Sequence, residues 1–451
     1  MRAITIAAMA LALSACVSAS NVNPVNQPLA TAAPAAEADL GVDGDAVVLS
    51  FSGGGARAAA FSYGALLEMR DMHAAAGGAL VDRVALVTAV SGGAITAAYF
   101  GQHGSAGLDG FRAAALDQDW VGELHTSLIA PANWLRAYKG GVNGRDRLAD
   151  WLDAHVYHGG AMHDLPHRPR IVLNATEIYT GAPFAFVAPY FDAICSNLGD
   201  VRIADAVAAS MSVPLAFKPV VVGAYAAACK APLPDWVAAA AQNRAAPALL
   251  RQTARAFQLY RDPERLKYLH LADGGVVDNY GLSSLITMRQ ASATPYGPFS
   301  ARDAVRAHRV VFLVVNAEQT LSGKWQLSAQ GPGGVEAIEA ALNDSINANK
   351  RIAYEAFAAT LDSWRHDLIA YRCALPKADA ARLGAGAGWK CDDVSFTLDS
   401  ISFADLEPAQ GARLAAAPTQ VSLPPALIDD LIAGGRTAVT QNPALKSLTA
   451  R

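Results

Sequence analysis

The sequence contains few charged residues, and it has no tract of lysine and arginine. Only 17% of its 451 residues are charged, and the formal net charge is −4. A nucleic-acid-binding protein favours a basic face, so this balance argues against nucleic acid as a partner. Disorder over most of the chain is not expected either, because 52% of the residues are hydrophobic and can form a large core.

Cysteine is also scarce, with five residues in the whole chain. None forms a Cys-x-x-Cys pair or a cluster with histidine at zinc spacing, so no metal site is expected. Cys16 lies near the N-terminus, and the other four form an even set that favours two disulfides in an exported protein. Three pairings are possible. Closure of local loops favours Cys195 with Cys229 and Cys373 with Cys391.

Beyond the N-terminus, no apolar run reaches the roughly 20 residues that a transmembrane helix needs. Arg2 precedes a mostly apolar stretch at residues 3–13, which is typical of a cleaved export signal. Leu-Ser-Ala-Cys at residues 13–16 resembles the lipobox of bacterial lipoproteins, which implies an acylated Cys16. We therefore expect a lipoprotein held in a membrane of the bacterial cell envelope, on the periplasmic face or in the outer membrane. An ordinary signal peptide with a chance cysteine is the alternative.

The first glycine-rich stretch follows an apolar strand pattern at residues 46–51. Gly53, Gly54 and Gly55 can bring backbone N–H groups close to a bound carbonyl, and such oxyanion donors contribute about 3–4 kcal/mol each. Arg57, just past this loop, is expected either to hold its shape or to meet an anionic head group. A phosphate-binding turn is the alternative, but the chain lacks the Gly-x-x-x-x-Gly-Lys-Ser/Thr motif and the acidic residue that would bind a ribose.

The second glycine-rich stretch, Ser-Gly-Gly, follows another apolar run at residues 84–90. A serine on a sharp turn between strand and helix is exposed as a nucleophile, and the crowded backbone there requires small neighbours. Ser91 has Gly93 two residues after it and Ala89 two residues before it, where the usual pattern has glycine. The stretch therefore predicts a nucleophile for acyl transfer, with one departure from the usual motif.

A third stretch, Asp-Gly-Gly, follows a strand pattern at residues 268–272. Asp273, followed by Gly274 and Gly275, can face the same crevice as Ser91. If burial raises its basicity, this carboxylate can accept the serine proton directly. Taken alone, the stretch is better explained as a turn in which the aspartate bonds its own backbone.

Strand and helix patterns alternate along the chain, which predicts an α/β fold with a mostly parallel central sheet and helices on both faces. Right-handed crossovers then place both glycine turns at the carboxyl ends of strands, where sites form in such folds. We expect four regions: a signal peptide at 1–15, a lipidated flexible tether at 16–43, a catalytic domain at 44–320 and an α+β extension at 321–451 packed on it. Near the C-terminus, a helix at 427–432 is expected to end at a glycine pair.

Taken together, these motifs resemble the patatin-like phospholipase family. Gly-Gly-Gly-x-Arg, x-x-Ser-Gly-Gly and Asp-Gly-Gly-Val-Val-Asp-Asn occur in the family's order within residues 46–282, and the segments at 174–176 and 208–214 also resemble those that flank its site. The resemblance implies a three-layer fold and hydrolysis of acyl esters of phospholipids and other lipids by a Ser–Asp dyad, without a cofactor. It assigns Ser91 as nucleophile, Asp273 as base and the three glycines as oxyanion donors. Supporting roles fall to Arg57, Gly93, Gly274 and Gly275.

We therefore expect a lipid-anchored serine acyl hydrolase. One alternative is an esterase with a Ser-His-Asp triad, although His270, three residues before Asp273 on a strand, should point to the opposite face. The other alternative is a non-catalytic envelope lipoprotein that binds lipid or protein on the same scaffold.

Overall fold

A computed structural model describes most of the chain. It covers residues 23–29, 39–120, 124, 145–214, 216–319, 327, 329 and 331–449. The expected signal peptide and Cys16 lie outside the described residues.

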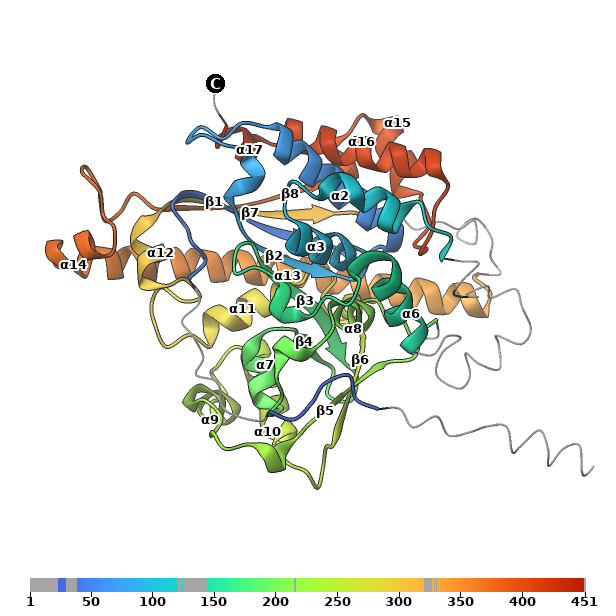
Figure 1. Cartoon of the computed structure of the whole chain (residues 1–451), viewed down its shortest axis with the longest axis horizontal. Helices are drawn as coiled ribbons and strands as arrows, with labels where there is room; N and C mark the ends of the chain where they lie inside the picture. Colours follow the sequence, from blue (N-terminus) through green and yellow to red (C-terminus); the bar gives the residue numbers. More distant parts are fainter. Residues whose placement is uncertain are drawn as a thin grey trace, which may run out of the picture.

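The centre of the molecule is an eight-stranded mixed sheet (Figure 1) with the order β5-β6-β3-β2-β1-β7-β8, in which β4 pairs with β3 beside this path. The strands β3, β2, β1, β7 and β8 run parallel, whereas β6 is antiparallel to β3 and β5. This arrangement confirms the expected mostly parallel sheet. The strands are β1 (Gly44–Phe51), β2 (Val84–Val90), β3 (Arg170–Glu177), β4 (Ala182–Ala185), β5 (Val220–Gly223), β6 (Tyr268–Asp273), β7 (Ala307–Asn316) and β8 (Ser395–Ser402).

Helices cover both faces of the sheet, as expected. The connection from β1 to β2 and the connection from β7 to β8 leave the centre in opposite directions, so right-handed crossovers put their helices on opposite faces. The helices are α2 (Gly55–Asp71), α3 (Gly92–His103), α6 (Arg145–Leu152), α7 (Ala188–Ala193), α8 (Ile203–Ser210), α9 (Asp235–Gln242), α10 (Ala248–Tyr260), α11 (Leu282–Gln290), α12 (Ala301–Arg306), α13 (Gly334–Ala374), α14 (Lys377–Arg382), α15 (Pro408–Ala415), α16 (Pro425–Gln441) and α17 (Pro443–Lys446). None of those in the described part is long and apolar enough to cross a bilayer.

The burial of each strand follows its position in the sheet. Every residue of β2 is buried, and so is every residue of β1 after Gly44, which is typical of parallel strands that are covered on both faces. β8 lies at one edge, and most of its residues are partly exposed. The carboxyl ends of β1 and β2 therefore meet in a buried environment beside the point where the strand order reverses, and sites form at such points.

The C-terminal region completes this core. β8 adds a parallel strand to β7, and α16 packs along α2. The expected helix end at Gly434 and Gly435 is wrong, because α16 continues to Gln441. A Cβ on Gly435 would lie 2.2 Å from the carbonyl oxygen of Phe61, and one on Gly64 would lie 2.1 Å from that of Ile432. The glycines of these two helices allow close backbone contact and do not stop α16.

The expected flexible tether is also wrong for residues 23–29, which pack against the edge strand β5. Val25 N–H donates to the carbonyl oxygen of Val221 at 3.0 Å. The side chain of Asn26, which is 2% exposed, exchanges hydrogen bonds of 3.0 and 2.7 Å with the backbone of Gly223. An unpaired strand edge offers free backbone groups, and this segment satisfies part of them.

The four cysteines outside the N-terminus pair as the local loops suggested. Disulfides join Cys195 to Cys229, with a Cα–Cα distance of 5.3 Å, and Cys373 to Cys391, with a Cα–Cα distance of 4.8 Å. The first connects the end of α7 to the segment before α9, and the second connects the end of α13 to the segment before β8.

Candidate active site

Ser91 occupies a tight turn between β2 and α3. Its backbone has φ 51° and ψ −124°, a conformation that a residue with a side chain adopts at a cost of about 1–3 kcal/mol. It caps α3, and its carbonyl oxygen accepts the N–H of Ala94 at 2.8 Å. The turn holds the serine at the positive end of the helix, where developing negative charge is stabilised.

The small residues around this turn are explained by close backbone contacts. A Cβ on Gly92 would lie 2.0 Å from the carbonyl oxygen of Gly55, and one on Gly93 would lie 2.6 Å from that of Ser52. The two glycine-rich stretches therefore pack directly on each other. Ala89, in contrast, lies inside β2, opposite Phe51 and Leu173, so extended strand geometry suffices there and glycine is not needed.

Asp273 ends β6 beside this turn. β3 connects the two, because Asn174 pairs with Val90 on one side and the next residue, Ala175, pairs with Asp273 on the other. The Asp273 carboxylate accepts the N–H of Gly275 at 2.8 Å, and the Ser91 side chain lies close enough to lower the pKa of this carboxyl. The structure thus brings together the serine and the aspartate that the sequence predicted.

Both side chains are shielded from water, with Ser91 7% and Asp273 6% exposed. Burial raises the pKa of Asp273 to about 6, although the Ser91 side chain and the Gly275 N–H partly oppose this rise. A carboxylate with a raised pKa is a stronger base than an ordinary aspartate and is still ionised near neutral pH. The pair therefore has the chemistry of a nucleophile and its general base.

The triple-glycine loop borders the nucleophile, but its three N–H groups are not equivalent. A Cβ on Gly53 would lie 3.2 Å from the Cβ of Ser91, so the loop is next to the serine. The N–H of Gly53 donates to the carbonyl oxygen of Asn279 at 3.1 Å, which corrects its expected role as an oxyanion donor. In the described structure, the N–H groups of Gly54 and Gly55 make no such bond, so they remain as candidates.

Arg57 is buried and holds the shape of this loop through hydrogen bonds to protein groups. Its guanidinium donates to the carbonyl oxygens of Ala317 at 2.9 Å and Ala417 at 2.5 Å, and to the hydroxyl of Thr419 at 3.0 Å. Burial lowers its pKa to about 10, and the residue is 3% exposed. The neighbouring Ala56 N–H donates to Gln420 at 2.8 Å. The C-terminal region thus supports the first turn of α2.

Four residues that the motifs did not assign hold the serine and the aspartate in place. The N–H of Ser91 donates to the hydroxyl oxygen of Ser210 at 2.8 Å, and that hydroxyl donates to the Asn174 carbonyl at 2.6 Å. Asp273 is fixed through its backbone. Its carbonyl accepts the Thr176 hydroxyl at 2.9 Å, and its N–H donates to the carbonyl of Ser212 at 2.9 Å. In the sequence, the one signal for these four residues was their position in the segments 174–176 and 208–214, which resemble the flanks of a known site.

The remaining predicted glycines support the turn after β6. A Cβ on Gly274 would lie 2.5 Å from the carbonyl oxygen of Asn174, and one on Gly275 would lie 2.6 Å from the Oδ1 of Asn279. His270 is exposed on β6, whereas Asp273, three residues later on the same strand, is buried. Within the part of the chain that the structure describes, no histidine forms a hydrogen bond with Ser91 or Asp273.

Similarity to known proteins extends over the segment that carries this site. A model of the family described as patatin-like phospholipase matches residues 49–286, which is more than half of the chain. No curated protein sequence matches.

Among solved structures, human GIVD cytosolic phospholipase A2 is similar at 13% identity with a TM-score of 0.35, over 62% of this chain and 47% of that one. VipD from Legionella pneumophila is similar at 13% identity with a TM-score of 0.32, over 97% of this chain and 73% of that one. The chain thus spans about half the length of the human phospholipase.

Proposed function

Because this chain belongs to the patatin-like phospholipase family, we propose that it hydrolyses acyl esters of phospholipids or other lipids with Ser91 as nucleophile and Asp273 as general base. The observation that carries the proposal is the close approach of these two buried side chains, near enough for Ser91 to lower the pKa of Asp273. They lie beside a glycine loop in which the N–H groups of Gly54 and Gly55 have no partner among the described residues. The reaction uses groups of the chain alone, and no metal or organic cofactor enters any step.

In the acylation step, Ser91 Oγ attacks the ester carbonyl carbon while its proton passes to the Asp273 carboxylate. The carbonyl oxygen becomes an oxyanion, and the N–H groups of Gly54 and Gly55 donate to it. Each preorganised donor of this kind contributes about 3–4 kcal/mol to stabilisation of the transition state. The intermediate collapses when the ester C–O bond breaks, and the leaving alcohol oxygen takes the proton from Asp273. The acyl group is then bound to Ser91.

Deacylation reverses these roles with water as the nucleophile. Asp273 accepts a proton from water, and the resulting hydroxide attacks the acyl carbonyl. The same oxyanion donors act again. The acyl–Oγ bond breaks, Asp273 returns its proton to Ser91 Oγ, and the fatty acid leaves. A Ser–Asp pair needs no histidine because the raised pKa of the buried carboxyl provides the basicity.

A direct test is hydrolysis of p-nitrophenyl butyrate in the presence of EDTA, together with labelling by a fluorophosphonate probe. We expect turnover by the parent protein and its loss in Ser91→Ala and Asp273→Asn. Labelling should be absent from Ser91→Ala and much slower in Asp273→Asn, because the serine there lacks its base. Ser62→Ala is the matched control, because Ser62 is a buried serine of α2 whose hydroxyl makes no hydrogen bond in the described structure.

Three outcomes would change this assignment. Near-normal turnover by Asp273→Asn would exclude the dyad, and loss of turnover on replacement of one histidine would indicate a triad. Failure of the folded parent to react with the probe at Ser91 would favour a binding protein on the same scaffold.

We also propose that Cys16 is acylated and that the protein is anchored in the cell envelope. This proposal is supported by the lipobox at residues 13–16 alone. Metabolic labelling with a radioactive fatty acid in a bacterial host tests it. Label should enter the parent and be absent from Cys16→Ser, whereas label retained by that variant, or absent from both, contradicts it.

A further inference from the structure

Basic residues are concentrated in one segment of this acidic chain. Residues 215–268 contain eight lysines and arginines and three aspartates and glutamates, a net charge of +5. Because the whole chain has a formal net charge of −4, the rest carries −9. In the fold this segment forms β5, α9, α10 and the start of β6, which lie together at the bottom of Figure 1. This segment is therefore cationic, whereas the rest of the chain is acidic.

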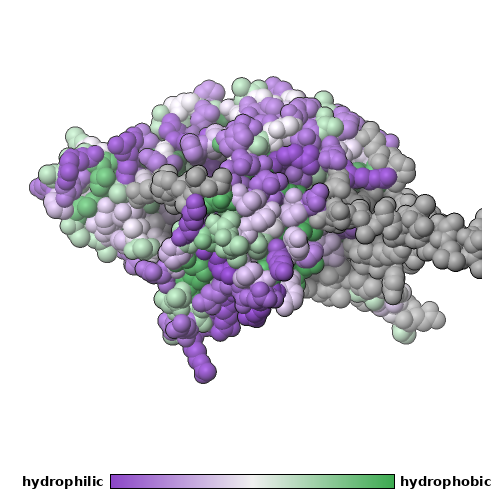
Figure 2. Space-filling model, turned by 60° about the horizontal axis from the view of Figure 1, so that its bottom comes forward, coloured by the Kyte–Doolittle hydropathy of each residue, from purple (hydrophilic) through white to green (hydrophobic). Residues whose placement is uncertain are grey.

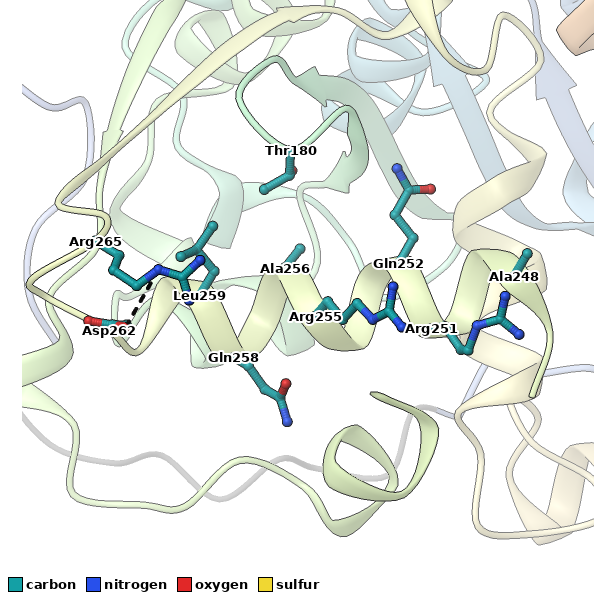
Figure 3. A pocket seen from close by; sticks show the side chains of 10 residues that line it. All are labelled: Thr180, Ala248, Arg251, Gln252, Arg255, Ala256, Gln258, Leu259, Asp262 and Arg265. Atoms are coloured by element: carbon teal, nitrogen blue, oxygen red, sulfur yellow. Dashed lines mark ion pairs between the residues drawn. The ribbon is translucent and has the colours of Figure 1, made fainter. Parts of the chain in front are cut away.

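An arginine-lined groove of about 680 Å³ runs along α10 of this segment (Figure 3). Arg251 is held in place, because its guanidinium donates to the carbonyl oxygens of Arg244 at 2.6 Å and Ala246 at 2.7 Å. Arg255 is exposed and forms no hydrogen bond or ion pair with any described residue. The side chain of Arg265 is 71% exposed and contacts Asp262 at 4.0 Å. Arg255 and Arg265 thus present guanidinium groups to solvent, and Arg251 holds a third at a fixed position.

Large apolar side chains protrude beside this groove. The exposed fractions are 47% for Ile178, 72% for Tyr179 and 53% for Tyr268. Ile178 N–H donates to the carbonyl oxygen of His270 at 3.1 Å, so the turn after β3 lies next to the start of β6. The next residue of that turn, Thr180, lines the groove. Figure 2 shows hydrophobic and hydrophilic side chains exposed side by side on this face.

This face lies at the carboxyl ends of β2 and β3, and the candidate active site lies at the same ends. Asn174 pairs with Val90, the residue before Ser91, and β3 then continues toward Ile178. Four residues of strand advance the chain by about 13 Å, so the exposed turn projects beyond the carboxyl end of β2. Ser212, whose carbonyl accepts the N–H of Asp273, precedes Val213, which is 38% exposed. Only short stretches of β3 and β6 therefore separate the protruding side chains from the candidate active site.

We propose that this face docks the protein on an anionic lipid bilayer. Its members, called the docking face below, are Ile178, Tyr179, Tyr268, Arg251, Arg255 and Arg265. Tyrosine favours the membrane interface, where its ring is apolar and its hydroxyl stays wet. The guanidinium groups bind lipid phosphates, for which their geometry is suited. The choice of lipid as the partner rests on the proposed function, and the docking itself does not require turnover.

The experiment measures partitioning of the full chain onto vesicles by co-sedimentation. All proteins carry Ser91→Ala, so that no lipid is degraded, and Cys16→Ser, so that no acyl anchor contributes. The vesicles are phosphatidylcholine alone or phosphatidylcholine with about 30% phosphatidylglycerol. The anionic lipid gives the second kind a negative surface potential, as in natural membranes. We expect stronger binding to the anionic vesicles, and we expect added salt to weaken it.

Reversal of two charges in Arg255→Glu/Arg265→Glu should weaken anionic binding at least about tenfold, because one basic residue near such a surface contributes roughly fivefold. Tyr179→Ser/Tyr268→Ser should weaken it as well. The matched control is Arg382→Glu/Arg413→Glu, the same charge change on the exposed helices α14 and α15, which lie away from α10 in Figure 1. Arg255→Gln/Arg265→Gln serves as a milder version if the reversal prevents folding.

Three results would overturn the proposal. These are equal binding to the two kinds of vesicle, unchanged binding by the docking-face variants, and an equal loss in the control variant, which would indicate a general charge effect. Each can occur whether or not the parent hydrolyses esters. A failure of docking is therefore distinguishable from a failure of the hydrolase proposal.

Discussion

The backbone N–H of Ser91 donates a hydrogen bond of 2.8 Å to the hydroxyl oxygen of Ser210. This bond fixes the strained turn of the nucleophile to α8, and the Ser210 hydroxyl is in turn held by the carbonyl of Asn174. Ser210→Ala would remove the hydrogen-bond partner of the buried Ser91 N–H, and an unsatisfied buried group costs about 1–3 kcal/mol. We expect kcat for a soluble ester to fall at least tenfold, with a smaller change in KM.

The control for this prediction lies two residues away. Ser212 is also buried, but its hydroxyl donates only to the Ala208 carbonyl within the preceding helix turn, at 2.7 Å. Ser212→Ala should therefore retain most of the activity. Equal kinetics for the two variants would show that the Ser91–Ser210 bond does not position the nucleophile.

The raised pKa of Asp273 predicts the pH dependence of activity. The carboxyl must be ionised to accept the serine proton, and burial places its pKa at about 6. The value of kcat/KM should therefore rise with pH and level off above a midpoint near pH 6, as measured with a soluble ester between about pH 4.5 and 8. A midpoint near pH 4, the ordinary value for aspartate, would contradict a buried base.

The same shift predicts how stability depends on pH. The folded protein binds the Asp273 proton more tightly than the unfolded chain does, so this group stabilises the fold fully below about pH 4. Its contribution is lost as pH rises through about 6, by roughly 3 kcal/mol for a shift of this size. Asp273→Asn lacks the charge. The variant should therefore gain in free energy of unfolding relative to the parent between pH 4 and 7 in urea titrations.

Close packing of α2 and α16 gives a prediction about stability. A Cβ on Gly435 would lie 2.2 Å from the backbone carbonyl of Phe61, which cannot rotate away. Gly435→Ala should therefore lower the free energy of unfolding by about 1–3 kcal/mol, despite the higher helix propensity of alanine. Gly386→Ala is the control, because nothing lies within 4 Å of its added Cβ. A neutral Gly435→Ala would show that the two helices can separate freely.

The features that the sequence predicted correctly depend on local patterns. A continuous apolar run followed by Ser-Gly-Gly indicates a buried strand and a tight turn, and the structure has β2 followed by Ser91. The order of the three motifs indicated the family, which the match over residues 49–286 confirms. The mostly parallel sheet follows from the alternation of strands and helices, and the structure confirms it as well.

The features that the sequence did not predict depend on distant partners. Gly434 and Gly435 look like a helix end until Phe61, far away in the chain, is known to lie against them. Gly53 looks equivalent to its neighbours until the carbonyl of Asn279 is found on its N–H. Ser210 resembles any other serine, because its role arises only when the sheet register brings Asn174 beside the turn at Ser91.

Arg57 offers a test of the link between the C-terminal region and the glycine loop. Its guanidinium reaches two backbone carbonyls and one hydroxyl at once, on the segments after β7 and α15. Lysine keeps the charge but offers a single point of contact. In Arg57→Lys the loop should lose its support, and misplacement of the oxyanion donors should reduce kcat by about 10²-fold.

The loss in Arg57→Lys should be the same for neutral p-nitrophenyl esters and for anionic phospholipids, because the Arg57 guanidinium is buried and bound to protein groups. Arg70→Lys is the matched control on the same helix, where the side chain forms surface ion pairs with Asp109 and Asp71. Exposed pairs of this kind contribute at most about 1 kcal/mol, so little activity should be lost. A defect confined to KM for anionic lipid would instead give Arg57 a role in substrate binding. The Gly53–Asn279 and Ala56–Gln420 hydrogen bonds would then support the loop.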